Sequence, residues 1–118
     1  MLKLNHKNLD VWKDSIQFVA AIYAVTESFP SSELYGLTNQ MRRAAVSVAS
    51  NIAEGASRSS IKDRRRFYEI ARSSLVEIDT QLEICVQLKF ISENKITGLS
   101  DQLGPLFAMT SNLVNSTR

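Results

Sequence analysis

Apolar residues recur at intervals of three and four along almost the whole of this chain, which is the spacing of an amphipathic α-helix. The N-terminal segment follows this spacing through Leu9, Trp12, Ile16, Val19, Tyr23 and Thr26. No segment shows the alternation of apolar and polar residues that is typical of a half-buried strand. The spacing therefore predicts an all-α protein.

Turn and capping residues divide the chain into four helices. Pro30 ends the first, because proline disfavours helical geometry in the residue before it. Thr38 is the expected N-cap of the second helix and Gly55 its expected stop, while Ser60 and Ser92 are expected to cap the third and fourth. After a leader of residues 1–8, the expected helices cover about 9–28, 37–55, 61–90 and 93–116.

The connections between these helices are short, so consecutive helices are expected to run antiparallel. With 118 residues the chain has the length of one domain, and we expect residues 1–118 to form a single antiparallel up-down-up-down four-helix bundle. Gly104 and Pro105 interrupt the last helix, but the apolar spacing stays in phase on both sides of them. A kink is expected there, and not a break.

The first helix carries a second apolar line, which consists of Val11, Phe18, Ile22, Val25 and Phe29. A helix in a lone bundle needs an apolar stripe of only about 100°. We therefore expect this second line to be exposed on a single copy and to form the interface of a homo-oligomer. The alternative is that the line packs inside its own chain.

Alanine and serine make the second helix a helix of small residues, so its neighbours can approach closely. Ser73 and Ser74 of the third helix are the expected opposing positions. Asn51, Glu54 and Gly55 form a structural motif at its end, which we interpret as a latch between helices or subunits. A carboxylate near a helix C-terminus requires a nearby cation, and Arg58 is a candidate.

These two helices also contain a recognisable pattern. It comprises Leu37, Gln40, Met41, Arg42, Arg43, Ser47 and Asn51-Ile52-Ala53-Glu54-Gly55, followed by Phe67, Ile70-Ala71, Ser73-Ser74-Leu75 and Glu77. The pattern also extends back to Leu9, Trp12, Tyr23 and Phe29-Pro30. Over nearly the whole chain, it resembles the family of four-helix-bundle proteins that were first noticed as products of intervening sequences in 23S rRNA genes. The resemblance implies a homopentameric barrel and no known enzyme activity. Relatives include an accessory protein that binds a reverse transcriptase and nucleic acid in diversity-generating retroelements.

Basic residues are concentrated in the middle of the chain, where residues 41–76 contain eight basic and three acidic side chains. The eight are Arg42, Arg43, Arg58, Lys62, Arg64, Arg65, Arg66 and Arg72. The planar guanidinium group suits phosphate, so these residues are the candidate nucleic-acid-binding site, through backbone contacts without base readout. The alternative is a solvated face in which Glu69 pairs with Arg65 or Arg72.

The usual residues of catalysis are scarce. The chain has one cysteine, Cys85, and one histidine, His6, and it has no phosphate-binding glycine motif or nucleophile elbow. We therefore expect no enzyme activity, no metal and no cofactor. The apolar run at 16–25 is too short to span a bilayer and no secretory signal is recognisable, so a cytoplasmic protein without a membrane partner is expected.

Two functions are consistent with these features of the sequence. The first is a non-enzymatic homo-oligomer, pentameric by the resemblance, that acts as an accessory protein and binds RNA or DNA non-specifically through its basic surface. The second is a scaffold or adaptor ring that docks an acidic partner protein without nucleic acid. The sequence leaves open the partner, the cellular process and the oligomer count.

Overall fold

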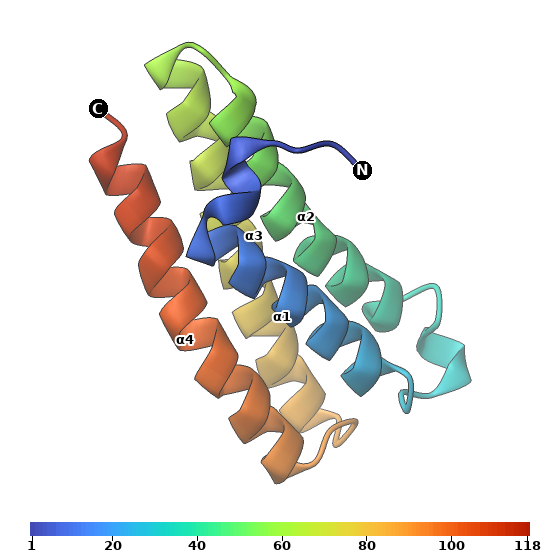
Figure 1. Cartoon of the computed structure of the whole chain (residues 1–118). Helices are drawn as coiled ribbons and strands as arrows, with labels where there is room; N and C mark the ends of the chain where they lie inside the picture. Colours follow the sequence, from blue (N-terminus) through green and yellow to red (C-terminus); the bar gives the residue numbers. More distant parts are fainter.

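The computed structural model describes residues 1–118 and contains four α-helices and two short 3-10 helices (Figure 1). The α-helices are α1 (Asp10–Thr26), α2 (Leu37–Ser57), α3 (Ile61–Gln87) and α4 (Glu93–Ser116). The 3-10 helices are η1 (Asn5–Asn8), which precedes α1, and η2 (Ser31–Glu33), which lies between α1 and α2. No helix combines the length and the apolar character that a membrane span requires.

Each helix packs against its neighbours in the chain, and α1 also packs against α4, so the four helices close into a bundle. The predicted antiparallel up-down-up-down arrangement is confirmed (Figure 1). The molecule measures 43 × 28 × 21 Å. Figure 1 shows the turn between α2 and α3 extending beyond the first turn of α1, while the C-terminal end of α4 reaches toward the same end of the bundle.

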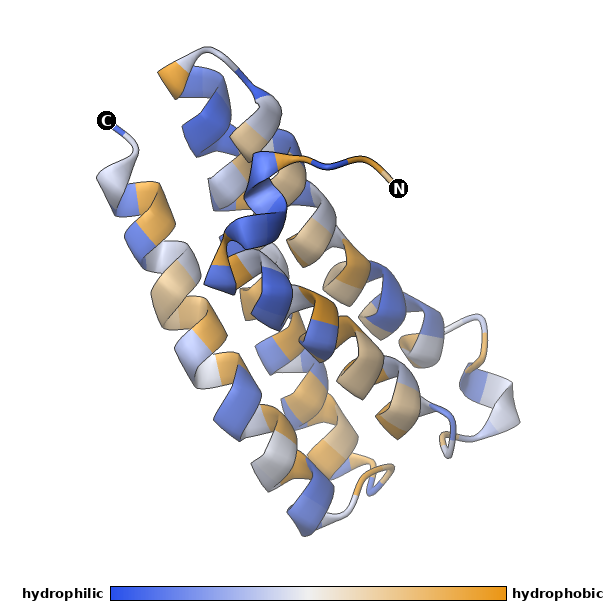
Figure 2. Cartoon of the chain, in the orientation of Figure 1, coloured by the Kyte–Doolittle hydropathy of each residue, from blue (hydrophilic) through white to orange (hydrophobic).

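Apolar side chains from all four helices meet in one core. Phe18 and Ile22 from α1, Ile52 from α2, Leu75 from α3 and Leu106 from α4 are each at most 1% exposed. Figure 2 shows that every helix carries both apolar and polar residues along its length, as expected of amphipathic helices. Burial of each such side chain contributes roughly 1.5–3 kcal/mol, so this core is the main source of stability.

The predicted exposure of the second apolar line of α1 is wrong. Val11, Phe18, Ile22 and Phe29 are buried within the single chain, and Val25 is half-buried against the same core. Two polar residues of α1, Ser15 and Thr26, are buried beside this line. Ser15 donates a hydrogen bond to the carbonyl of Trp12, and Thr26 donates one to the carbonyl of Ile22, so both hydroxyls are satisfied inside the bundle.

The other apolar line of α1 is the more exposed one. Leu9, Trp12 and Val19 are half-buried at the edges of the core, whereas Ile16 and Tyr23 are 44% and 42% exposed. Helix α1 contacts both α2 and α4, so its buried stripe is wider than a single seam. The alternative that the second line packs inside its own chain is therefore correct.

Two of the predicted helix signals have different roles in the structure. Gly36, and not Thr38, is the N-cap of α2, and Thr38 is buried inside the helix. Helix α2 continues past Gly55 to Ser57, and Gly55 does not adopt the positive φ of a C-terminal stop. Ser60 and Ser92 do cap their helices, since each hydroxyl accepts a hydrogen bond from a backbone N–H three residues on.

Helix α3 ends at Gln87, three residues before the predicted end, and a lysine explains the difference. Lys89 adopts a left-handed conformation with φ of 59°, and the N–H of Phe90 donates to the carbonyl of Cys85 at 3.0 Å. This is the hydrogen bond of a Schellman motif, which usually has glycine at the left-handed position. Helix α4 continues through Pro105 without a break, as expected, but Figure 1 shows no sharp bend at the expected kink.

Candidate nucleic-acid interface

The eight predicted nucleic-acid-binding residues do not form one surface. Arg42 and Arg43 lie near the start of α2, and Arg72 lies in the middle of α3. The other five surround the turn from α2 to α3 and are named here the basic tip: Arg58, Lys62, Arg64, Arg65 and Arg66. Arg43 and Arg58 are separated by roughly 22 Å along α2, at the helical rise of about 1.5 Å per residue.

A close approach of two helices builds the basic tip. A Cβ atom on Gly55 would stand 2.6 Å from Cε1 of Tyr68 and 3.1 Å from the carbonyl oxygen of Arg64. Only glycine therefore lets the end of α2 lie against the buried ring of Tyr68 at this distance. Residues 58–60 are enough to join the two helices, and Ser60 starts α3 by accepting a hydrogen bond from the N–H of Asp63 at 3.2 Å.

Local acidic residues neutralise part of the basic tip. Arg58 forms an ion pair with Glu54, and Arg65 forms one with Glu69 at 3.2 Å, both across one helical turn and both exposed. The second pair is the one that the solvated-face alternative predicts. Exposed pairs of this kind contribute only about 0.2–1 kcal/mol, so either arginine can exchange its partner for a phosphate at little cost.

The remaining cations of the tip differ in accessibility. Lys62 and Arg66 are exposed and take part in no ion pair. Arg66 and Arg58 both lie over the ring of Phe67, with their guanidinium carbons 5.8 and 4.8 Å from its centroid. Arg64 is half-buried, and its Nε atom is buried without a hydrogen-bond partner. Consecutive arginines on a helix face different directions, so Arg64 is the least available for a ligand.

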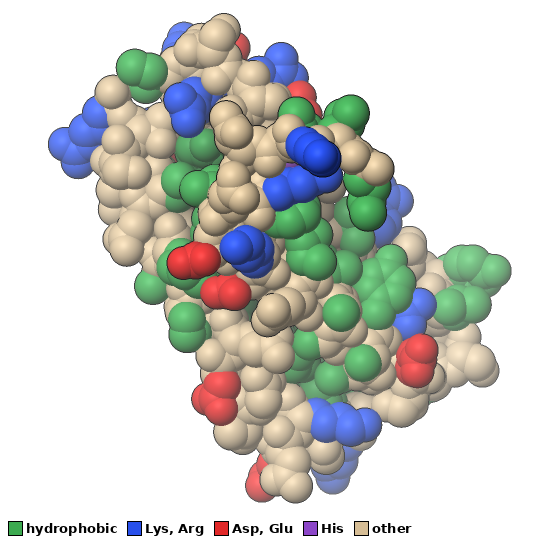
Figure 3. All heavy atoms as spheres, in the orientation of Figure 1, with side chains coloured by type: hydrophobic (Ala, Val, Ile, Leu, Met, Phe, Trp, Pro, Cys, Tyr) green, Lys and Arg blue, Asp and Glu red, His purple; other side chains and the backbone are tan.

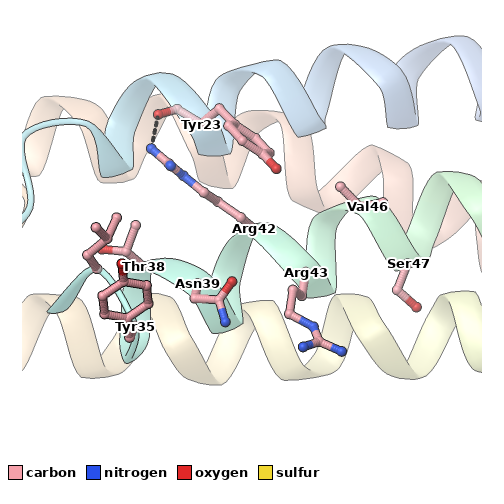
Figure 4. Close-up of a pocket in the computed structure, with 9 residues that line it drawn as sticks. Tyr23, Tyr35, Thr38, Asn39, Arg42, Arg43, Val46 and Ser47 are labelled. Carbon is pink, nitrogen blue, oxygen red and sulfur yellow. Dashed lines mark hydrogen bonds between the residues drawn. The ribbon is translucent and has the colours of Figure 1, made fainter.

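Arg42 and Arg43 line a groove of about 600 Å³ at the other end of α2 (Figure 4). It is named here the tyrosine groove, because Tyr23 of α1 and Tyr35 of the preceding loop form part of its wall. Figure 3 shows apolar side chains gathered over α1 and α2 on one face of the molecule. In the sequence, Tyr23 belongs to a helical seam, and Tyr35 belongs to no helical pattern because it lies in a loop, so the pattern of residues does not predict this groove.

The structure offers little for catalysis or metal binding. It contains no cluster of three or more His, Cys, Asp or Glu side chains that could hold a metal ion. Cys85 is fully buried beside Met41, and burial raises the pKa of its thiol to about 11. The thiolate is the reactive form of cysteine, so Cys85 is a packing residue.

The sequence matches the model of a protein family described as 23S rRNA-intervening sequence protein, over residues 7–112. The chain belongs to this family. Its fold is similar to the crystal structure of a protein of unknown function from the S23 ribosomal protein family of Bacteroides thetaiotaomicron, with a TM-score of 0.80. The two chains are 17% identical, and the match covers 90% of this chain and 99% of the other. No curated protein matches the sequence.

In this member of the 23S rRNA-intervening sequence family, the residues of the Asn51, Glu54 and Gly55 motif have separate roles. Gly55 allows the close approach of α2 to Tyr68. Nδ2 of Asn51 donates to the carbonyl and the hydroxyl of Ser47, and Ser74 of α3 donates to the same hydroxyl at 3.0 Å. Asn51 therefore joins α2 to α3 through Ser47. Glu54 pairs within its own chain segment, so in a single chain it is not a latch between helices.

Proposed function

We propose that this protein is a non-enzymatic accessory protein that binds the phosphate backbone of RNA or DNA without sequence preference. The basic tip carries this proposal, because it places five cations at one end of the bundle with only two of them in ion pairs. A convex cationic end can contact phosphates of many nucleic-acid shapes. Such binding is weak and depends strongly on salt, because bound cations release counterions from the nucleic acid.

We also propose that the protein forms a homo-oligomer, with the pentamer that the family resemblance implies. The buried line of α1 gives no support to this part of the proposal. Support comes instead from Val76 and Phe107, which are 53% and 39% exposed and border a groove of about 370 Å³ between α3 and α4. Exposed apolar side chains that line a groove are typical of association surfaces. Native mass spectrometry measures the copy number, and a monomer at micromolar concentration would contradict it.

The binding experiment compares two double variants with the same loss of charge. Lys62→Gln with Arg66→Gln removes the two tip cations that have no acidic partner. Lys13→Gln with Lys95→Gln removes two exposed cations from α1 and α4. Fluorescence anisotropy with a labelled RNA duplex and a labelled unstructured single strand measures affinity between about 50 and 200 mM salt.

The tip variant is expected to bind both RNAs more weakly and to have a smaller dependence of affinity on salt. The logarithmic slope falls by roughly 0.7–0.9 for each phosphate contact that is lost. The control variant is expected to behave like the wild type. Equal losses in the two variants would show a general charge effect and would contradict a role for the tip. Absence of binding at about 50 mM salt would reject nucleic acid as the ligand and favour the acidic protein partner.

A further inference from the structure

The tyrosine groove combines open aromatic surface with uncompensated positive charge. Nine residues line it, and none of them is acidic. Its volume of about 600 Å³ lies within the range of roughly 300–1,000 Å³ that is usual for small-molecule sites. Figure 4 shows Tyr23 and Arg42 reaching toward each other between α1 and α2, with Tyr35 beside the first turn of α2 and Arg43 on the side of α2 that faces α3.

Tyr35 is the most exposed aromatic residue of the chain, with 92% of its surface accessible. The backbone that carries it is nevertheless fixed. The N–H of Gly36 donates to the carbonyl of Glu33 at 3.0 Å, and the N–H of Leu37 donates to the carboxylate of Glu33 at 3.1 Å. The phenol ring is thus held out from an ordered turn with its faces free, which is the arrangement of a stacking platform.

Arg42 is held in place by three contacts with α1. Its Nε donates to the hydroxyl of Thr26 at 2.9 Å, its Nη2 donates to the carbonyl of Tyr23 at 3.4 Å, and its guanidinium carbon lies 4.6 Å from the centroid of the Tyr23 ring. A guanidinium group has five N–H donors, so three remain for a ligand. Arg43 is exposed and takes part in no ion pair.

These features select the chemistry of the occupant. Two cations without an acidic partner call for an anion, and the planar fork of N–H donors on arginine matches the oxygen atoms of a phosphate or a carboxylate. A free aromatic face calls for a flat, uncharged group. A nucleotide supplies both a flat base and an anionic phosphate, and one sugar separates them. Only an unpaired base can present its face to a side chain.

We infer that the tyrosine groove holds an unpaired nucleotide of single-stranded RNA or DNA, with its base stacked on Tyr35 and its phosphate bound by Arg42. This inference rests on the proposed function and adds to it a preference for single strands over duplexes. Stacking does not distinguish one base from another, so the preference is for strandedness and not for sequence. The basic tip, at the other end of α2, then binds more distant phosphates of a single strand or a duplex.

The test uses the full-length protein and two labelled probes of equal length, an unstructured RNA single strand and an RNA duplex. Tyr35→Ala removes the stacking platform, and Tyr35→Trp retains it. Leu88→Ala is the control, because Leu88 is a large, exposed apolar residue just after α3 that lines neither the tyrosine groove nor the groove between α3 and α4. Tyr35 contributes little buried surface, so the variants are expected to fold, and thermal melting by circular dichroism verifies this.

Tyr35→Ala is expected to weaken single-strand binding roughly 5- to 150-fold, as a base-stacking contribution of about 1–3 kcal/mol predicts, and to leave duplex binding unchanged. Tyr35→Trp and Leu88→Ala are expected to bind both probes like the wild type. Unchanged single-strand binding by Tyr35→Ala, with wild-type protein that still binds both probes, overturns the inference and leaves the proposed function intact. Failure of the wild type to bind either probe overturns both.

One further outcome concerns a different occupant. Tyrosine and arginine are also enriched in protein interfaces, so a second copy of the chain is the main competitor for the groove. Native mass spectrometry of Tyr35→Ala decides between them. The inference predicts that Tyr35→Ala has the same copy number as the wild type. A lower copy number for Tyr35→Ala would show that another copy of the chain covers the groove, and it would overturn the inference.

Discussion

The two ends of α2 carry arginines in opposite settings. At the basic tip, five cations lie on a convex end of the molecule, and two of them pair with acidic residues one turn away. At the tyrosine groove, two cations lie in a hollow that has no acidic side chain, and Arg42 is oriented by contacts with a neighbouring helix. The groove has fewer charges but the more specific geometry.

This difference shows that the number of basic residues in a segment is a poor guide to a binding site. The sequence concentrates charge at the tip, where exposed ion pairs and free rotation of long side chains weaken any fixed arrangement. The groove becomes visible only when α1, the loop that follows it and α2 are placed together. Four changes test the comparison, in order of decreasing effect on stability.

The largest effect is expected on α1, which contributes one residue to the core and another to the groove. Phe18→Ala should lower the free energy of unfolding by about 3–5 kcal/mol, because Phe18 is 1% exposed. Tyr23→Ala should cost only about 1 kcal/mol, mainly through the contact of Tyr23 with Arg42. Urea denaturation measures both. Equal losses would mean that the groove wall is as essential to the fold as the core.

The next effect concerns the base of the tip. Gly55→Ala should cost about 1–3 kcal/mol, because the added Cβ would collide with the buried ring of Tyr68 and with the backbone of α3. Gly98→Ala is the control, since a Cβ there meets nothing within 4 Å and alanine favours the helix by up to about 1 kcal/mol. The melting temperature should therefore fall for Gly55→Ala and rise for Gly98→Ala. A stabilised Gly55→Ala variant would contradict the close approach.

A smaller effect is expected from the support of Arg42. Thr26→Val removes the hydroxyl that accepts its Nε–H and should cost about 0.5–1.5 kcal/mol. Thr97→Val is the control, because the Thr97 hydroxyl donates only to a backbone carbonyl of its own helix. Denaturation and single-strand binding are measured together. If Arg42 binds phosphate, only Thr26→Val should also weaken binding; equal affinities would exclude the orienting role of Thr26.

The smallest effect is expected from Glu54→Gln. Glu54 and Arg58 form an ion pair whose side chains are 48% and 44% exposed, so its loss should cost about 0.2–1 kcal/mol at low salt and less at high salt. A thermal melt at two salt concentrations measures this. A loss above about 2 kcal/mol that is insensitive to salt would show that Glu54 has a buried partner in another subunit, as the latch hypothesis predicts.

Helix positions and topology were predictable because their causes are local. The spacing of apolar residues and the serine caps act within one or two helical turns, and short loops force antiparallel neighbours. The expected contact of the small α2 face with Ser74 is confirmed by its hydrogen bond to Ser47. The end of α3 was misplaced because Lys89 adopts a conformation that sequence patterns assign to glycine.

The amino-acid sequence by itself determined four amphipathic helices, their order and the clustering of basic residues, since each follows from neighbours along the chain. Only the tertiary structure decided which apolar line of α1 faces inward, that Gly55 accommodates Tyr68, and that Tyr35 and Arg42 share a groove. The physical reason is that burial, close approach and concavity depend on segments far apart in the sequence. A helical pattern fixes the angle between two side chains on one helix, but it does not fix which neighbouring helix each side chain meets.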